Sequence, residues 1–319
     1  MRTVVIGGTG HIGSFLVPRL VHAGHQVAVM SRGERRPYIA DDTWSDVAMV
    51  VCNRQEEEND GTFGPQVAAL APDAVLDLTC FTVDSARHLV EALPPSVHIV
   101  HTGSIWAYGR SLVIPVDETS RKAPFGSYGV NKARIEDYLI RGQERLRATV
   151  IHPGHITGPG WVPINPAGNL ELRVFADLID SGRAVLPERG MGLLQHVHAD
   201  DVAALHLAVL SQPDRSAGEA FNSVAVQSMT LRGYAELIAT EYGHQLELQL
   251  LPWSEYVARV GESVAAVTYD HIERSPHVSA TKAERLLGFR HARSGWSAVS
   301  EAIDWLISDG RLAAPEVAK

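Results

Sequence analysis

Gly7-Gly8-Thr9-Gly10-His11-Ile12-Gly13 lies near the start of the chain, between the apolar, β-branched run 3–6 and the amphipathic segment 14–23. The run has the composition of a strand, and the segment has the period of a helix. In such an arrangement the first glycine permits a tight turn, the second lets a ligand approach the backbone, and the third allows close helix packing. Because a helix N-terminus attracts phosphate, this stretch predicts a dinucleotide site. The candidate residues are Gly7, Gly10, His11, Ile12 and Gly13.

Strand-like and helix-like segments continue to alternate through the first half of the chain. The strand-like runs are almost entirely apolar, as expected for strands of a parallel sheet that helices cover on both faces. We therefore expect an α/β protein with a Rossmann-type, doubly wound parallel sheet. The strand-like runs are 26–30, 46–52, 74–78, 97–102 and 148–152, and the helix-like segments are 64–71, 83–93 and 127–142.

Residues at the ends of these strands are candidate cofactor contacts, because ligands bind at the carboxyl edge of such sheets. The second strand ends in Ser31-Arg32-Gly33, where an NAD site usually has a carboxylate for the ribose hydroxyls. A guanidinium suits the 2'-phosphate of NADP instead, so NADP is favoured and NAD is the alternative. An ordinary solvated charge run at 32–36 would also explain this stretch. The next two strand ends add Asn53, Arg54, Leu78 and Thr79.

Tyr128 and Lys132 are four residues apart in the expected helix 127–142, so their side chains share one face. A phenol ordinarily loses its proton at about pH 10, and an adjacent ammonium favours the phenolate. The pair is therefore a candidate for proton transfer. Because the same spacing is common on exposed helices, this assignment depends on the motifs around it.

Four motifs in a fixed order resemble those of a known family. The glycine loop is followed by Thr102-Gly103-Ser104-Ile105-Trp106-Ala107-Tyr108-Gly109, by Tyr128-x-x-x-Lys132, and by the segment from His152 to Gly160. Residues 195–203 and 279–289 are also similar to family segments. The chain resembles the extended short-chain dehydrogenase/reductases, the NAD-dependent epimerase/dehydratase family, over nearly its whole length.

The resemblance implies a role for each residue of the catalytic set. Tyr128 would exchange a proton with a substrate hydroxyl or carbonyl, while the nicotinamide exchanges hydride with the adjacent carbon. Lys132 would lower the tyrosine pKa and bind the nicotinamide ribose, and Ser104 would hydrogen-bond the substrate oxygen. Thr102 is a weaker candidate for that oxygen contact. Tyr128, Lys132, Thr102 and His152 also join the candidate cofactor contacts.

These roles describe an NAD(P)-dependent oxidoreductase that acts at a secondary alcohol or carbonyl of a sugar-like or other small polar substrate. One alternative is a nucleotide-sugar epimerase or dehydratase that keeps its cofactor bound. Another is a non-enzymatic, dinucleotide-binding sensor or RNA-associated protein. Nucleotide-sugar epimerases of the family usually have an Arg where this chain has Leu194, so a diphosphate would lack a cationic partner here.

The pattern loosens after residue 153 into Pro- and Gly-rich loops. We expect residues 1–160 to form the dinucleotide-binding domain with the catalytic Ser, Tyr and Lys. Residues 161–319 would form mainly a smaller α/β substrate-binding portion, interleaved with the first. Candidate substrate contacts are Ser104, Tyr128, His155, Trp161 and Asn169, with Asn165 as a further candidate.

Composition narrows the range of partners. The net charge of -9 disfavours nucleic acid and anionic membranes, and no apolar run approaches about 18 residues. Without a signal-peptide pattern at the start, we expect a cytoplasmic protein. His196 and His198 share a strand face but lack a third ligand, so no metal is expected, and Cys52 and Cys80 are expected to be reduced. The resemblance implies a homodimer.

Overall fold

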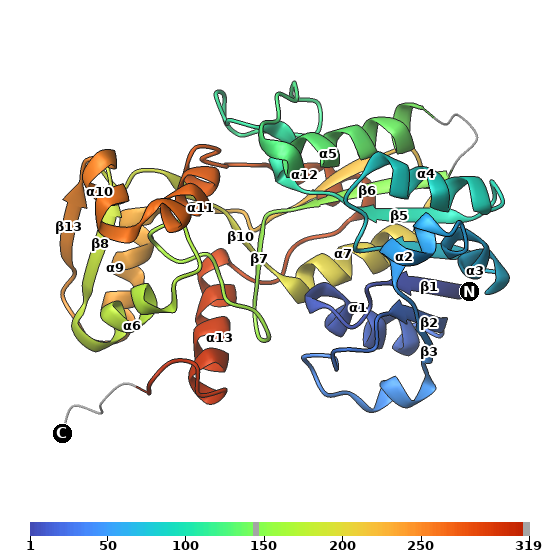
Figure 1. The fold of residues 1–319 in the computed structure, drawn as a ribbon, viewed down its shortest axis with the longest axis horizontal. Coiled ribbons are helices and arrows are strands. Elements are labelled where there is room, and N and C mark those ends of the chain that lie inside the picture. Colours follow the sequence, from blue (N-terminus) through green and yellow to red (C-terminus); the bar gives the residue numbers. More distant parts are fainter. Residues whose placement is uncertain (143–146, 315–319) are drawn as a thin grey trace.

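The larger lobe is built on a seven-stranded parallel sheet with the order β11-β6-β5-β4-β1-β2-β3 (Figure 1). The computed structural model describes residues 1–142 and 147–314. This sheet confirms the expected Rossmann-type α/β fold. Its strands are β1 (Arg2–Ile6), β2 (Gln26–Ser31), β3 (Ala48–Val51), β4 (Ala74–Asp77), β5 (His98–Thr102), β6 (Arg147–Pro153) and β11 (Ala220–Ser223).

Helices cover both faces of this sheet because successive residues of each strand point to opposite sides. Val5 packs in the core with α1 and α7, whereas Val4 and Ile6 pack in a second core under α3 and α4. The ends of β4 and β5 lie between these layers, beside α5. The helices of this lobe are α1 (His11–His22), α2 (Arg54–Asn59), α3 (Phe63–Ala69), α4 (Val83–Ala92), α5 (Gly126–Glu136), α7 (Ala199–Ser211), α8 (Pro213–Ser216) and α12 (Thr281–Leu287).

The helix expected over 127–142 is regular only as far as Glu136. From Asp137 to Arg141 the backbone widens into a π-helical turn, in which the Gly142 N–H donates to the Asp137 carbonyl at 3.0 Å. Short 3-10 turns lie at η1 (Asp42–Asp46) and η2 (Ile105–Tyr108). The second of these immediately follows Ser104, so it fixes the chain at the end of β5.

A smaller lobe has its own apolar core, which includes Phe175, Leu186, Tyr234 and Ile303. Two short parallel strands, β7 (His155–Thr157) and β10 (His196–His198), pair between the lobes (Figure 1). The remaining elements are α6 (Leu172–Ser181), β8 (Arg183–Pro187), β9 (Leu193–Leu194), β12 (Met229–Thr230), α9 (Leu231–Glu241), β13 (Glu247–Leu251), α10 (Trp253–Val260), α11 (Glu262–Ile272) and α13 (Gly295–Ser308).

The chain passes between the two lobes more than once. After β7 it enters the smaller lobe, but α7, β11 and α12 belong to the larger one, where α7 packs closely on α1. Residues beyond 160 therefore complete the dinucleotide-binding lobe as well as forming the smaller lobe. Over the described residues, none of the helices has both the length and the apolarity needed to span a bilayer.

Candidate active site

The glycine loop is packed so closely that Gly7 and Gly13 have no room for a side chain. Gly7 has a φ of 82°, and a Cβ there would lie 2.4 Å from the Thr79 methyl carbon. A Cβ at Gly13 would lie 2.2 Å from the Gly8 carbonyl oxygen. No side chain caps α1 at Gly10, so backbone N–H groups at this helix start are free to bind phosphate. The residues present therefore fit a dinucleotide, and Leu78 and Thr79 follow β4 directly beside Gly7.

Trp161, an expected substrate contact, lies at this glycine loop. Its ring stacks on His11 with 5.3 Å between centroids and 12° between planes. His11 Nε2 also bonds the Pro159 carbonyl at 3.1 Å, and burial lowers the pKa of His11 to about 4, so the imidazole is neutral. Trp161 thus covers the start of α1, next to the predicted pyrophosphate position.

Two arginines follow neighbouring strands but differ in surroundings. Arg32, after β2, is 59% exposed and pairs with Glu34 at 3.1 Å, an exchangeable surface contact near Ser31. Arg54, after β3 and Asn53, is only 14% exposed. Its guanidinium donates to Glu58 at 2.6 Å and to Asp77 at 2.8 Å. Because these carboxylates already hold the Arg54 guanidinium, the expected contact between this side chain and the cofactor is not supported.

Lys132 joins the catalytic helix to the sheet edge. It is 1% exposed, and its Nζ donates to the carbonyls of Cys80 at 2.8 Å and Thr102 at 2.7 Å. Cys80 follows β4 and Thr102 ends β5, so the ammonium is bound at the ends of both strands. Cys80 directly follows Thr79, whose side chain lies against Gly7. One of its three N–H donors is left for a ligand. Burial lowers the pKa of Lys132 to about 8.

The pKa of Tyr128 differs from the expectation. Burial of its hydroxyl end raises this pKa, and the hydrogen bond with Ser104 opposes the rise only in part, although the whole residue is 40% exposed. Lys132 does not lower it here, because the ammonium lies 5.7 Å from the ring centre and faces two carbonyls. The phenol is therefore protonated at neutral pH.

Ser104 lies over His152, whose two ring nitrogens are both engaged, so its expected contact with the cofactor is not supported. The Ser104 N–H donates to His152 Nδ1 at 3.0 Å, and His152 Nε2 lies 2.9 Å from Glu136 Oε2. The Ser104 Oγ accepts a bond from the Trp106 backbone N–H at 3.1 Å, and its hydroxyl also hydrogen-bonds Tyr128. The serine hydroxyl is thus held near Tyr128.

Thr102 contributes its backbone, not its side chain, to this edge. Its Oγ1 bonds His206 Nε2 at 2.9 Å in the core on the α7 side. The His206 Nδ1 must carry the proton, since it faces the Val202 carbonyl at 2.8 Å, so the Thr102 hydroxyl donates. The expected side-chain contact of Thr102 with a ligand is therefore not supported, and its carbonyl binds Lys132.

The glycine cradle and the convergence of Ser104, Tyr128 and Lys132 agree with the match to a family model. The model of the NAD dependent epimerase/dehydratase family matches residues 3–223, more than half of the chain. The chain belongs to this family. It is an NAD(P)-dependent enzyme of the extended short-chain dehydrogenase/reductase type, as the sequence motifs predict.

Several relatives of this epimerase/dehydratase family member align over most of its length. The 2'-dehydrokanamycin reductase of Streptomyces kanamyceticus is 26% identical, covering 99% of this chain and 88% of its own. The chloroplast stem-loop binding protein of 41 kDa b of Arabidopsis thaliana is 25% identical, covering 89% of this chain and 75% of its own. The dTDP-glucose 4,6-dehydratase of Bacillus anthracis, solved with NAD, has a TM-score of 0.74 at 15% identity over 98% of both chains, which shows the shared fold.

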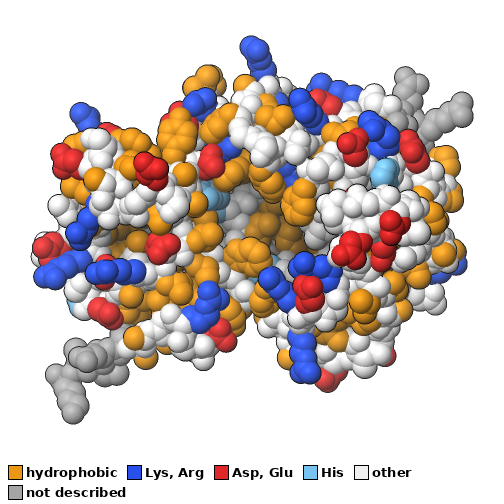
Figure 2. All heavy atoms as spheres, viewed as in Figure 1, with side chains coloured by type: hydrophobic (Ala, Val, Ile, Leu, Met, Phe, Trp, Pro, Cys, Tyr) orange, Lys and Arg blue, Asp and Glu red, His pale blue; other side chains and the backbone are white. Residues whose placement is uncertain are grey.

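A hollow opens between the two lobes (Figure 2), in the region where the strands β7 and β10 pair (Figure 1). Trp106 packs edge-on to Tyr128 at 5.6 Å and to His271 at 5.1 Å between ring centroids. His155 follows at 5.4 Å from His271, with a buried Nε2 that has no partner among the described residues. His155, an expected substrate contact, therefore lies two rings away from Tyr128.

Asn169 is buried inside the smaller lobe, so its expected substrate contact is not supported. Its amide donates to Tyr256 at 3.2 Å and Thr268 at 3.0 Å, and its oxygen accepts from Asn165 at 2.7 Å. Asn165 is buried in the same network. Both amides hold the loop that precedes α6 and have no free group for a ligand.

Arg274, which lies against Trp106, is held mainly by protein groups, although its Nε has no partner among the described residues. Arg274 is buried, with its guanidinium carbon 3.7 Å from the centre of the Trp106 ring and 3.9 Å from that of Phe125. Its terminal nitrogens donate to the backbone of Phe125 and Asp270. Leu194, at the position of the family's usual Arg, is fully buried in the smaller core. The structure thus shows no free guanidinium at this position for a diphosphate.

One buried group of possible metal ligands occurs in the described ranges: Asp77, Cys80 and His101, with donor atoms within 4.8 Å of one another. Asp77 is already paired with Arg54. Burial raises the pKa of the Cys80 thiol to about 12, which disfavours the thiolate that binds metals. Cys80 and Cys52 are both free, buried thiols.

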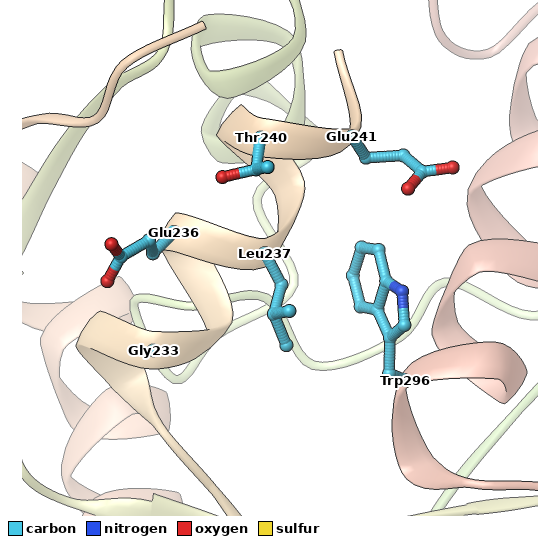
Figure 3. Close-up of a pocket in the computed structure, with 6 residues that line it drawn as sticks. All are labelled: Gly233, Glu236, Leu237, Thr240, Glu241 and Trp296. Atoms are coloured by element: carbon cyan, nitrogen blue, oxygen red, sulfur yellow. The ribbon is translucent and has the colours of Figure 1, made fainter. Parts of the chain in front are cut away.

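A separate hollow of about 390 Å³ lies on the smaller lobe, between α9 and α13 (Figure 3). It is far from Tyr128 in the fold, since both helices pack in the core of the smaller lobe. We assign it no part in the chemistry. Its lining residues are Gly233, Glu236, Leu237, Thr240, Glu241 and Trp296.

Sequence reasoning missed Glu136, Lys122 and Trp106 as parts of the site. Glu136 could have been found, because it follows Lys132 by the same four residues that separate Lys132 from Tyr128. Lys122 reaches the site from a loop, where no periodicity indicates direction.

Proposed function

We propose that this protein transfers hydride between NADP and the carbonyl or alcohol carbon of an uncharged, sugar-like or other small polar substrate. The observation that carries the proposal is the contact of the Lys132 ammonium with the carbonyls of Cys80 and Thr102. It brings the helix of Tyr128 to the strand ends that flank the glycine cradle. When bound, the nicotinamide supplies or accepts the hydride.

The protein's own groups suit the reductive direction. The protonated phenol of Tyr128 donates its proton to the substrate oxygen as negative charge develops there. The Ser104 hydroxyl, which hydrogen-bonds Tyr128 and is fixed by the Trp106 backbone N–H, is placed to donate a hydrogen bond to the same oxygen. Lys132 offers its remaining N–H to the cofactor ribose and places positive charge near the phenolate that results.

An uncharged substrate is supported by the cleft wall. Its depth shows mainly neutral and apolar atoms (Figure 2), and the guanidinium of Arg274 is bound by Trp106, Phe125 and the backbone. Burying a diphosphate without a free cation would cost roughly several kcal/mol of free energy for each charge that lacks a partner. The relative that covers nearly the whole chain is named as a 2'-dehydrokanamycin reductase, which supports net reduction.

The deciding experiment is a turnover assay with purified protein. NADPH or NADH is mixed in turn with uncharged aldoses, ketoses, lactones and nucleotide sugars, and the absorbance of the reduced nicotinamide is followed while products are analysed by mass spectrometry. We expect steady oxidation of NADPH with an uncharged carbonyl compound. Epimerised nucleotide sugar without net cofactor consumption would support the bound-cofactor alternative instead.

The same proposal includes a homodimer, a cytoplasmic location and no nucleic-acid partner. One relative is named as a stem-loop binding protein, so RNA binding is the second candidate function. The net charge of -9 opposes it. Light scattering in solution would give the subunit number, and a gel-shift assay with structured RNA would detect the alternative.

Arg32→Ala tests the choice between the two dinucleotides. Losing a charged hydrogen bond to the 2'-phosphate should weaken NADPH binding about tenfold and NADH binding less than about twofold. Isothermal titration calorimetry of both ligands measures the effect. Arg173→Ala, at an exposed site in the smaller lobe, is the control. An unchanged ratio of the two affinities would remove Arg32 from the NADP site.

A further inference from the structure

We propose that Lys122, Glu136 and His152 form a buried chain that positions Ser104 for the reaction. The chain runs from the Lys122 ammonium to the Glu136 carboxylate, then through the His152 imidazole to the backbone N–H of Ser104. The proposed function enters at one point only, where it gives Ser104 the task of binding the reacting oxygen. His152 and Glu136 act through Ser104 and are positioning residues.

The tautomer of His152 follows from its partners. A backbone N–H only donates, so the Nδ1 that lies 3.0 Å from the Ser104 nitrogen carries no proton. The neutral imidazole then has its proton on Nε2, 2.9 Å from Glu136 Oε2, and donates it to the carboxylate. His152 is therefore a neutral bridge between a carboxylate and the backbone of Ser104.

Glu136 is charged despite its burial. Burial raises its pKa, but the hydrogen bond from His152 and the nearby Lys122 ammonium outweigh this and lower it. A charged acceptor makes a shorter and stronger hydrogen bond than a neutral one. The carboxylate therefore holds the imidazole in the single orientation that presents Nδ1 to Ser104.

Gly103 provides independent support. A Cβ at this residue would lie 2.5 Å from His152 Nδ1, so the imidazole fits under the turn only because Gly103 has no side chain. Ser104 itself is extended, with φ of -167° and ψ of 146°, and begins η2. Its backbone is held by His152 and its Oγ by the Trp106 N–H, so both ends of the residue are fixed.

The chain also relates Ser104 to Tyr128. Glu136 lies on α5 with Tyr128 and Lys132, at successive intervals of four residues, while His152 lies on β6. One face of α5 thus carries the proton donor, the ammonium and the carboxylate. The distance between the Ser104 and Tyr128 hydroxyls is set through this helix, and a displaced hydroxyl costs turnover more than binding.

His152→Ala, His152→Asn and the control His98→Ala test the proposal in the full-length protein. His98 is also buried and bonded, to Thr149 Oγ1 at 2.9 Å, but begins β5 at the opposite edge of the sheet. We expect His152→Ala to lower kcat about 10- to 100-fold with dinucleotide Kd within about twofold. The Asn amide oxygen can accept the Ser104 N–H, so His152→Asn should recover about tenfold of kcat.

The kcat of each variant is compared with its thermal stability. His98→Ala should lose stability without losing kcat. Wild-type kcat in His152→Ala, equal kcat losses in His152→Ala and His98→Ala, or no recovery in His152→Asn would each overturn the proposal. If His152→Ala does not fold, Glu136→Gln replaces it, with an expected kcat loss of about tenfold that an unchanged kcat would contradict.

Failure of the proposed function gives a different result. If the wild-type protein turns over no carbonyl compound, the reductase assignment fails. The hydrogen-bond chain from Lys122 to Ser104 can still be tested, because nitrogen NMR of the His152 imidazole shows which ring nitrogen carries the proton. We expect an unprotonated Nδ1 and a protonated Nε2 at neutral pH. The opposite tautomer would overturn the positioning chain whatever the reaction is.

Discussion

Tyr128→Phe is expected to lower kcat by about a thousandfold while leaving dinucleotide affinity within about twofold. The substitution removes only the phenolic oxygen, which is the proton donor to the substrate oxygen. The ring remains to pack on Trp106 at 5.6 Å. The binding groups of the glycine loop and the Lys132 contacts with Cys80 and Thr102 are untouched. Steady-state kinetics and dinucleotide titration of the same preparation measure both quantities.

Tyr269→Phe is the matched control for this variant. Tyr269 is 41% exposed, close to the 40% of Tyr128, and its hydroxyl accepts only a long bond from Arg110 at 3.4 Å. We expect its kcat to equal that of the wild type. Activity of Tyr128→Phe within about threefold of wild type would show that another group supplies the proton.

Arg54→Met is expected to destabilise the protein by about 3–5 kcal/mol. The variant keeps most of the apolar stem but leaves the buried carboxylates of Asp77 and Glu58 without their guanidinium. Denaturant unfolding followed by circular dichroism measures the free energy of unfolding.

Arg87→Met is the control, because Arg87 forms an ion pair of the same length at an exposed site. Arg87 pairs with Asp84 at 2.8 Å, like Arg54 with Asp77, but it is 46% exposed and Asp84 is 80% exposed. We expect a loss of at most about 1 kcal/mol. Should Arg54→Met instead keep its unfolding free energy and lose NADPH affinity, Arg54 would be a cofactor contact as its place after β3 first indicated.

The larger lobe is predictable from sequence because its signals are local. A strand, a glycine loop and a helix follow one another within residues 3–22, and the apolar strands that follow allow only a covered parallel sheet. The family and its NAD(P) chemistry are confirmed for the same reason, since four motifs occur in order. The helix α13 was not foreseen, although its buried residues complete the core of the smaller lobe.

The direction of a side chain was harder to predict than its place along the strand. Thr102 and Ser104 both lie where β5 ends, yet Thr102 bonds His206 on one side of the sheet and Ser104 meets Tyr128 on the other. His152 and Arg54 show the same difficulty. Each lies near the carboxyl edge of the sheet, but its side chain is bound by a carboxylate distant in sequence. Partners 16 and 23 residues away leave no periodic signal in the sequence.

The repeated passage of the chain between the lobes limits how this enzyme can be recombined with its relatives. A single crossover near residue 160 would exchange α7 and β11 together with the substrate half. Val202, Leu205 and Phe221 of those elements share a core with Leu16 and Val29 of the dinucleotide half. Substitutions near Trp106, His155 and His271 would therefore alter substrate specificity with less damage to this core than an exchange of the two halves of the gene.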